Sequence, residues 1–203
     1  MTYKEAKEQV LKLLNQYTKA GDAISALYNN QQDYLVRIPS FINDAMMEIA
    51  TTARKIPTSL NLDALPHMDL GEDVRIELPS NFYQFKSGDT VKTDDGRVLH
   101  TNQYSLLGKR YIVIPKRELD NVRITYYRYP FLLEENPDDA ATLDNAPETH
   151  FAVPFYVAAM LVAHDDAFLC SLFMNKYNDK LQNMHSGITA ESHATNDAYG
   201  FFM

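Results

Sequence analysis

The 203-residue chain is long enough to bury one sizeable core, and with 45% hydrophobic and 23% charged residues it has the composition of a folded protein. Its net charge of −8 is concentrated in residues 131–203, which hold two basic and eleven acidic residues and therefore argue against DNA binding by that surface. A single cysteine excludes an internal disulfide, and neither a signal-peptide core nor a membrane-spanning run is found, so we expect a reduced, soluble chain of intracellular type.

The first part of the chain is predicted to be helical. Thr2 and Glu5 have the spacing of a capping box, in which each side chain satisfies a free amide at the start of a helix. Apolar residues then recur at helical spacing, which predicts a helix over residues 3–19, and a short second helix is expected over residues 22–28.

A further helix is expected to open at Pro39, because the missing N–H of proline costs nothing in a first turn. Pro57 is expected to end it. Its buried face is a continuous apolar stripe made of Ile42, Ala45, Met46, Ile49, Ala50 and Ala53.

From Asp73 the hydrophobic period changes from helical to alternating, which predicts strands. Residues 111–114 and 122–129 are the strongest of these, and Asp95-Gly96 and Gly108-Lys109 are turn signals. The spacings are short, so we expect an antiparallel meander of four to six strands.

The last third combines an acidic segment with two helices. Residues 134–150 hold six acidic residues and no Lys or Arg, as in a solvated linker. Pro154 is expected to start a deeply buried helix that ends at His164, and Asp165-Asp166 to cap a second helix that ends near Leu181.

The predicted fold class is α+β, a helical body with an inserted antiparallel β lobe. We expect an N-terminal helical part over residues 1–69, the β lobe over 70–130, the acidic linker and helix pair over 131–182, and a tail arm over 183–203. Together these parts are expected to form one compact domain.

Motifs that carry chemistry are mostly missing from the sequence. It holds no Gly-rich phosphate loop, no Gly-x-Ser-x-Gly elbow, no Cys-x-x-Cys and no His-Glu-x-x-His. The pairs Asp94-Asp95 and Asp138-Asp139 lie in turn-like contexts and are interpreted as solvated loops rather than acid/base couples. We therefore expect no catalytic, cofactor-binding or metal-binding residues and no cofactor.

One constellation offers an enzymatic alternative. His150 and His164, with Asp165 and Asp166, are the residue types of a metal-dependent phosphohydrolase of the HD type. Helix capping by the aspartates and a helix-end position for His164 explain the same residues without a metal.

Basic residues of the β lobe offer a surface for an acidic partner or a nucleic-acid backbone, although acidic residues are interspersed among them. They are Lys109, Arg110, Lys116, Arg117, Arg123 and Arg128.

Four stretches within residues 35–182 resemble the head–tail connector proteins of tailed bacteriophages, also described as adaptor or head-completion proteins. The four are Ile38-Pro-Ser-Phe-Ile-Asn-Asp-Ala-Met-Met-Glu-Ile-Ala50, Leu78-Pro-Ser-Asn-Phe82, Tyr126-Tyr-Arg-Tyr-Pro130, and the late pattern of Tyr156-Val-Ala-Ala, His164-Asp-Asp and Phe173 to Tyr177. Each is a pattern of apolar and turn residues rather than a chemical signature.

The resemblance implies a non-enzymatic structural protein of the virion neck, made in the host bacterial cytoplasm. It implies a ring of about a dozen copies that joins the portal protein to the tail or to a second neck protein, with two different complementary surfaces on each subunit. DNA would pass through the ring without sequence-specific binding, and no membrane would be involved. An acidic segment at Glu134, Glu135, Asp138 and Asp139 would then serve as a solvated channel wall or as a partner-seeking loop.

Two groups of aromatic residues are candidate partner-binding residues. Tyr127 and Tyr129 lie on one side of the strand 122–129, while Val122, Ile124 and Tyr126 lie on the other. The second group ends the chain, as an arm that docks on a partner or folds back on its own core: Tyr199, Phe201, Phe202 and Met203. The alternatives to a neck adaptor are the metal-dependent phosphohydrolase and another virion component, such as a tail-completion or fibre-linked protein.

Overall fold

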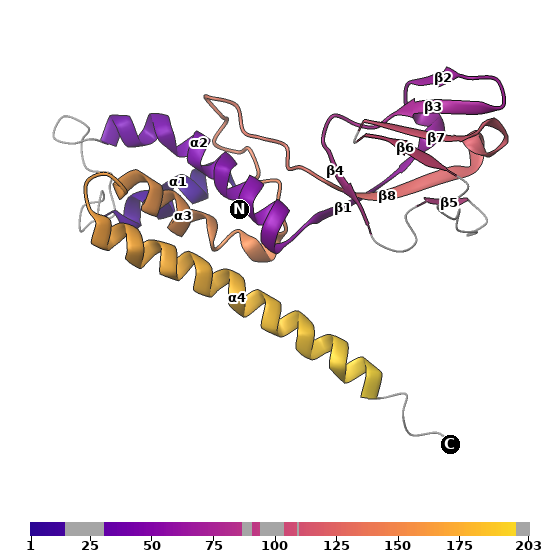
Figure 1. Ribbon diagram of the computed structural model, residues 1–203. Coiled ribbons are helices and arrows are strands. Elements are labelled where there is room, and N and C mark those ends of the chain that lie inside the picture. The colour runs from indigo at the N-terminus through magenta and orange to yellow at the C-terminus, as the bar shows by residue number, and fades with distance from the viewer. Residues whose placement is uncertain (15–30, 87–90, 94–103, 109, 198–203) are drawn as a thin grey trace. The chain divides into compact units, whose positions relative to one another are not determined.

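The computed structural model describes residues 1–14, 31–86, 91–93, 104–108 and 110–197 (Figure 1). The fold is α+β, as predicted. The chain divides into two compact units, each described here by itself. The helical unit contains Met1–Arg54 and Leu132–Met203, and the β unit contains Lys55–Phe131.

Among its described residues, the helical unit has four helices, and α3 packs against the other three. They are α1 (Tyr3–Leu13), α2 (Gln31–Glu48), α3 (Val153–Val162) and α4 (Ala167–Asp197). A single π-helical turn, Ile49–Ala53, follows α2, and a 3₁₀ turn, Pro147–Thr149, precedes α3. The prediction that α3 is apolar all round and deeply buried is confirmed, since seven of its residues are buried.

The predicted capping box at the start of α1 is confirmed. The amide of Glu5 donates to Thr2 Oγ1 at 3.2 Å, and the amide of Thr2 donates to Glu5 Oε2 at 2.8 Å. The predicted extension of this helix to residue 19 and the short helix over residues 22–28 lie outside the described residues.

The prediction that Pro39 opens a helix is wrong, because α2 begins at Gln31 and Pro39 lies inside it. Proline in a helix interior removes one backbone hydrogen bond and crowds the preceding turn. Here the buried side chains of Ile38 and Ile42 flank the proline, and an Asp33–Arg37 ion pair at 3.1 Å spans the preceding turn. These contacts stabilise the helix by more than the missing backbone hydrogen bond costs.

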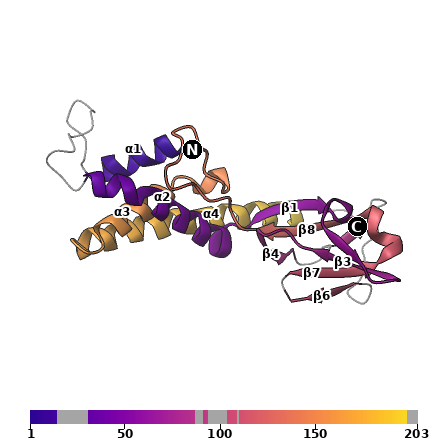
Figure 2. The ribbon, with the colours of Figure 1, turned by 90° about the horizontal axis from the view of Figure 1, so that it is seen from above.

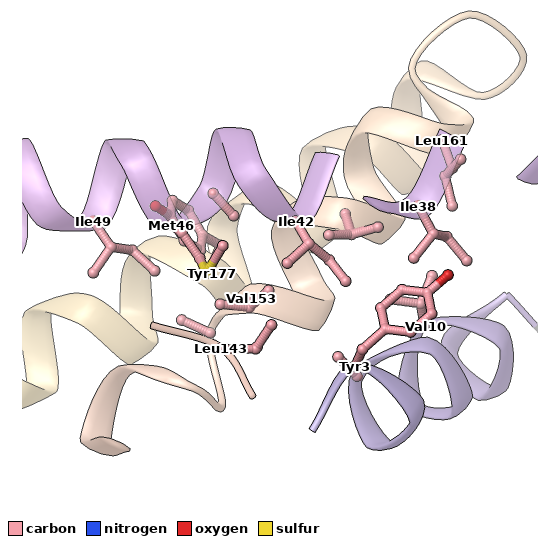
Figure 3. Close-up of a cluster of buried hydrophobic side chains, with 14 of the residues drawn as sticks. Tyr3, Val10, Ile38, Ile42, Met46, Ile49, Leu143, Val153, Leu161 and Tyr177 are labelled. Atoms are coloured by element: carbon pink, nitrogen blue, oxygen red, sulfur yellow. The ribbon is translucent and has the colours of Figure 1, made fainter. Parts of the chain in front are cut away.

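The core of the helical unit gathers side chains from every helix (Figure 3). Ile38 and Ile42 of α2 face Tyr3 and Val10 of α1, and Met46 lies farther along α2. Its remaining labelled members come from α3, α4, the π turn and the acidic segment: Val153, Leu161, Tyr177, Ile49 and Leu143.

The acidic segment is an ordered loop that packs on the helices, more structured than the solvated linker expected from its composition. Leu143 is buried, and Thr142 forms an isolated antiparallel bridge with Thr2. At its start, the side chain of Asn43 on α2 accepts from the amide of Leu133 at 2.8 Å and donates to its carbonyl at 3.0 Å.

Helix α4 continues to Asp197, well beyond the predicted end near Leu181, so the first part of the expected tail arm is helical. Asp166 caps its start as predicted, with Oδ1 accepting from the amide of Leu169 at 2.9 Å. Once a helix is nucleated, each further residue adds one hydrogen bond, so it can outlast the apolar periodicity that the prediction relied on.

The described part of the β unit forms two antiparallel sheets of four strands each (Figure 2). The first sheet has the order β1-β8-β4, with β5 also paired to β8, and the second has the order β2-β3-β7-β6. The strands of the first sheet are β1 (Ile56–Asn61), β4 (Phe82–Phe85), β5 (Val91–Thr93) and β8 (Val122–Arg128). Those of the second are β2 (His67–Asp69), β3 (Asp73–Glu77), β6 (Ser105–Leu107) and β7 (Tyr111–Pro115).

Strands β3, β7 and β8 lie where the alternation predicted them, and their inward residues form one apolar core between the sheets. Gly108 adopts a φ of +62° in the turn between β6 and β7, as its turn signal predicted. The expected meander of four to six strands is wrong, because β8 pairs with β1, β4 and β5, which are distant in sequence.

Strands β1 and β2 precede residue 70, where the sequence placed the start of the lobe. Pro57, predicted to end a helix, lies instead in β1. That strand pairs only with β8 and so forms an edge, where a residue without an N–H is tolerated.

Candidate partner-binding face of the β unit

One face of the β unit is the outward side of the sheet built by β1, β4, β5 and β8. Along β8, Val122, Ile124 and Tyr126 point into the core, so Arg123, Thr125 and Tyr127 point outward. The register places their partners on the same side, and we call the whole set the basic face: Lys55, Pro57, Ser59, Asn61, Tyr83, Gln84, Lys92, Arg123, Thr125, Tyr127 and Tyr129.

Lateral contacts order the polar side chains of the basic face. The Ser59 and Thr125 hydroxyls are 3.2 Å apart, and Arg123 Nε donates to Asn61 Oδ1 at 3.0 Å. The Nζ atom of Lys55 lies 5.3 Å from the centroid of the Tyr127 ring, in a cation–π contact.

Two tyrosines extend this order toward the end of the sheet. The rings of Tyr83 and Tyr129 are 5.0 Å apart at their centroids and are tilted by 46°. Both residues are half-buried, so their rings pack together while part of each remains accessible to a partner.

The charge of the basic face has one sign. None of the strands β1, β4, β5 and β8 contains an Asp or Glu, and the register sets Lys92 directly opposite Arg123. Like charges on directly opposed residues weaken a sheet. Neither Lys55 nor Arg123 pairs with a carboxylate of the part of the chain that the structure describes.

In the other sheet, two cations pair with carboxylates. Arg110 donates from Nε and Nη2 to Glu77 Oε1 at 3.0 and 2.9 Å, which raises the pKa of the Arg110 guanidinium. Lys116 pairs with Asp69, and this hydrogen bond lowers the pKa of the Asp69 carboxyl. Arg75 stacks on the Tyr111 ring at 4.9 Å.

The basic residues singled out in the sequence therefore do not form one cluster. Arg123 lies on the basic face, whereas Arg110 and Lys116 pair with acids of the other sheet, and Arg117 lies 3.6 Å from Glu118. Arg128 contacts Phe131 and donates to the Tyr129 carbonyl, and Lys109 lies outside the described residues.

The residues of the enzymatic alternative are not assembled. His150 and His164 lie at opposite ends of α3, whose ten residues span about 15 Å. The N-terminal ammonium donates to His150 Nδ1 at 2.9 Å, so Nε2 carries the proton and donates to the Asn145 carbonyl at 3.1 Å. Among the described residues, no group of three or more His, Cys, Asp or Glu is placed to hold a metal ion.

The surroundings of His150 lower its pKa. Burial is the main cause, and the neighbouring N-terminal ammonium adds to it. A neutral, buried imidazole that bridges two backbone groups supports the fold of the acidic segment rather than a reaction.

Of the predicted partner-binding residues, Tyr127 and Tyr129 lie on the basic face, and Tyr199, Phe201, Phe202 and Met203 lie outside the described residues. Sequence reasoning missed Lys55, Tyr83 and Lys92. The signal that could have found them is the lack of any acidic residue in four strands of a chain with 27 Asp and Glu.

A protein-family model described as SU10 adaptor protein matches residues 1–198, which is nearly the whole chain. The chain belongs to the SU10 adaptor family. This is a family of phage head–tail adaptors, which confirms the resemblance seen in the sequence.

As an SU10 adaptor, the chain is a structural component of a phage virion. The matched residues take in both units, so the basic face belongs to the adaptor itself. A search among curated proteins gave no match. No helix in the described part of the chain has the length and apolar character needed to cross a membrane.

Proposed function

We propose that this adaptor is a non-enzymatic subunit of a ring in the virion neck, where about a dozen copies join the portal protein to the tail or to a second neck protein. The family match carries the proposal. DNA passes through the ring without sequence-specific binding.

The surfaces of the chain support a ring. A closed ring of identical subunits needs two different, mutually complementary surfaces on each copy. Residues 55–131 hold 11 basic and 10 acidic residues, whereas the remainder of the chain holds 8 basic and 17 acidic residues. The two units therefore differ in charge as two sides of a heterologous contact would.

Binding to purified portal rings tests the proposal. Adaptor added in excess should saturate the portal at a fixed ratio. Native mass spectrometry should then show a single complex whose mass exceeds that of the portal by a fixed number of adaptor subunits, and electron microscopy should show an added ring of density. Absence of a complex with portal under conditions that preserve both proteins would contradict the proposed function.

The acidic loop, residues 134–139, has two candidate roles in such a ring, a solvated channel wall and a loop that binds a partner. As a channel wall it would repel DNA phosphates and keep the genome from sticking during passage. In that role, replacement of Glu134, Glu135, Asp138 and Asp139 by Lys impairs DNA delivery while folding and ring assembly stay intact. Unchanged infectivity of the quadruple variant would refute the wall.

The aromatic end of the chain is proposed as a docking arm for a partner, built on Tyr199, Phe201, Phe202 and Met203. Truncation after Asp197 separates this role from packing on the chain's own core. Lost portal binding with an unchanged unfolding midpoint supports the arm, whereas a lowered midpoint of the monomer supports packing.

A further inference from the structure

The basic face offers two cations at the ends of one outward row. Arg123 and Tyr127 are four residues apart on β8, which corresponds to about 13 Å, and Lys55 lies over the Tyr127 ring. Hydroxyl donors lie between and beside these charges, on Ser59, Thr125 and Tyr127. Such a row suits a short acidic segment that carries carboxylates at both ends.

The acidic loop of the helical unit carries charge of the opposite sign. Glu134, Glu135 and Asp138 are exposed and lie within five residues of one another. Glu134 and Glu135 make no ion pair with any residue that the structure describes. Their carboxylates are therefore available to a second molecule.

The acidic loop is also held in place at both ends, which lowers the entropy lost on binding. Leu133 exchanges two hydrogen bonds with the Asn43 side chain. At the other end, Lys7 pairs with Asp139 at 2.7 Å, and the amide of Lys4 donates to the Asp139 carbonyl at 3.1 Å. The Lys7 hydrogen bond lowers the pKa of Asp139, so this carboxyl stays ionised.

A second copy of the chain fits the basic face better than DNA does. DNA would approach a molecule of net charge −8 against its overall field, whereas the acidic loop is present once in every subunit. A contact of the basic face with the acidic loop is heterologous, since it leaves one surface of each kind free to continue the ring.

We propose that the basic face of each copy binds the acidic loop of the neighbouring copy, around Lys55 and Arg123 on one side and Glu134, Glu135 and Asp138 on the other. This assignment rests on the proposed ring. It gives the acidic loop the role of a subunit contact rather than of a channel wall.

Two charge-reversed variants of the full chain test the contact. Lys55→Glu/Arg123→Glu breaks only the basic face, and Glu134→Lys/Glu135→Lys breaks only the acidic loop. In sedimentation velocity at high protein concentration, wild type should form oligomers that dissociate as salt is raised. Each variant alone should associate about tenfold more weakly or worse.

An equimolar mixture of the two variants gives the sharper result. The first variant keeps an intact loop and the second keeps an intact face, so the wild-type contact can form between them. The reversed face of the first is also opposite in charge to the reversed loop of the second, so the mixture should regain assembly with the two variants alternating. Matched controls reverse exposed charges elsewhere, with Arg117→Glu/Lys176→Glu and Asp165→Lys/Asp179→Lys, and should assemble as wild type. Unfolding midpoints checked for all four variants exclude misfolding as the cause.

Three outcomes would overturn the inference: a mixture that stays monomeric, site variants that assemble as wild type does, or a wild type that does not self-associate. A face variant that loses only the binding of labelled DNA would reassign the face to DNA. If the adaptor still saturates portal rings in these cases, the ring stands and only the contact is wrong. Failure to bind portal contradicts the proposed function itself.

Discussion

The helical unit and the β unit differ in how many polar side chains are buried beside their apolar cores. In the described part of the β unit, no Asn, Thr, His or charged residue is buried, and strand pairing satisfies the backbone. In the helical unit Asn145, Thr149 and His150 are buried beside the apolar core. They lie in an irregular segment, where Thr149 donates to the Ala146 carbonyl at 2.7 Å and His150 donates to that of Asn145.

The acidic segment is therefore structured largely by polar contacts rather than by regular secondary structure. Its carboxylates can therefore face water while its backbone stays fixed. In the β unit the opposite holds, since the sheets fix the backbone and leave the outward side chains free to carry charge.

The largest expected effect is the loss of stability when one buried side chain is removed from either core. Ile42→Ala in the helical unit and Ile124→Ala in the β unit each remove a fully buried side chain, which costs about 2–5 kcal/mol of unfolding free energy. Hydrogen exchange measured by mass spectrometry should show lost protection in the unit that carries the substitution. Equal loss of protection in both units would mean that the two cores unfold as one, and Leu107→Ala at an exposed position is the matched control.

Acidification should weaken the helical unit selectively. The pKa of folded His150 lies below its ordinary value, so the unfolded chain binds the proton more readily. The stability contribution is complete above pH of about 6.5 and is lost as the pH falls toward the folded pKa. Denaturant unfolding followed across this window should show the decline.

Two replacements check the source of that decline. His150→Gln should remove the decline that begins near pH 6.5, and His67→Gln at an exposed position of the β unit should leave it in place. A decline that survives His150→Gln would assign it to other groups.

A smaller effect is expected at the start of α1. Thr2→Ala removes the hydroxyl that accepts from Glu5, which should cost about 1 kcal/mol of unfolding free energy in the helical unit. Thr2→Ser keeps the acceptor and should restore most of the loss. Both are measured by urea denaturation, and equal midpoints for Ala and Ser would show that the capping hydroxyl contributes nothing.

The smallest effect concerns the surface of the β unit. A double-mutant cycle with Lys55→Met and Tyr127→Leu should give a coupling of about 0.5–1 kcal/mol, as for exposed cation–π pairs. A coupling near zero would mean that the Lys55 side chain is not held over the ring, and the basic face would then be less ordered than described.

Local signals made several elements predictable from the sequence. The capping box at Thr2 and Glu5, the apolar helix α3 and the alternating strand β8 each depend on neighbours within a few residues. The prediction for Pro39 is wrong because its local preference for a first turn is overridden by burial of Ile38 and Ile42, which depends on tertiary packing.

The basic face could not be predicted for the same reason. Tyr127 and Tyr129 were found from the alternation of one strand, but Lys55 joins them only through the pairing of β1 with β8. Similarly, the exposed carboxylates of residues 134–139 were evident from composition, whereas the anchoring of that loop requires Asn43 and Lys7, which are distant in sequence.

The pairing of β1 with β8 has one more consequence. Ile56 stands opposite Arg128, so the chain enters and leaves the β unit at neighbouring points, about 5 Å apart as in any antiparallel pair. An insert with adjoining ends can be removed, exchanged or transplanted as a cassette without stretching its host. Phages could thus diversify this lobe by recombination while the surrounding helices keep their sequence.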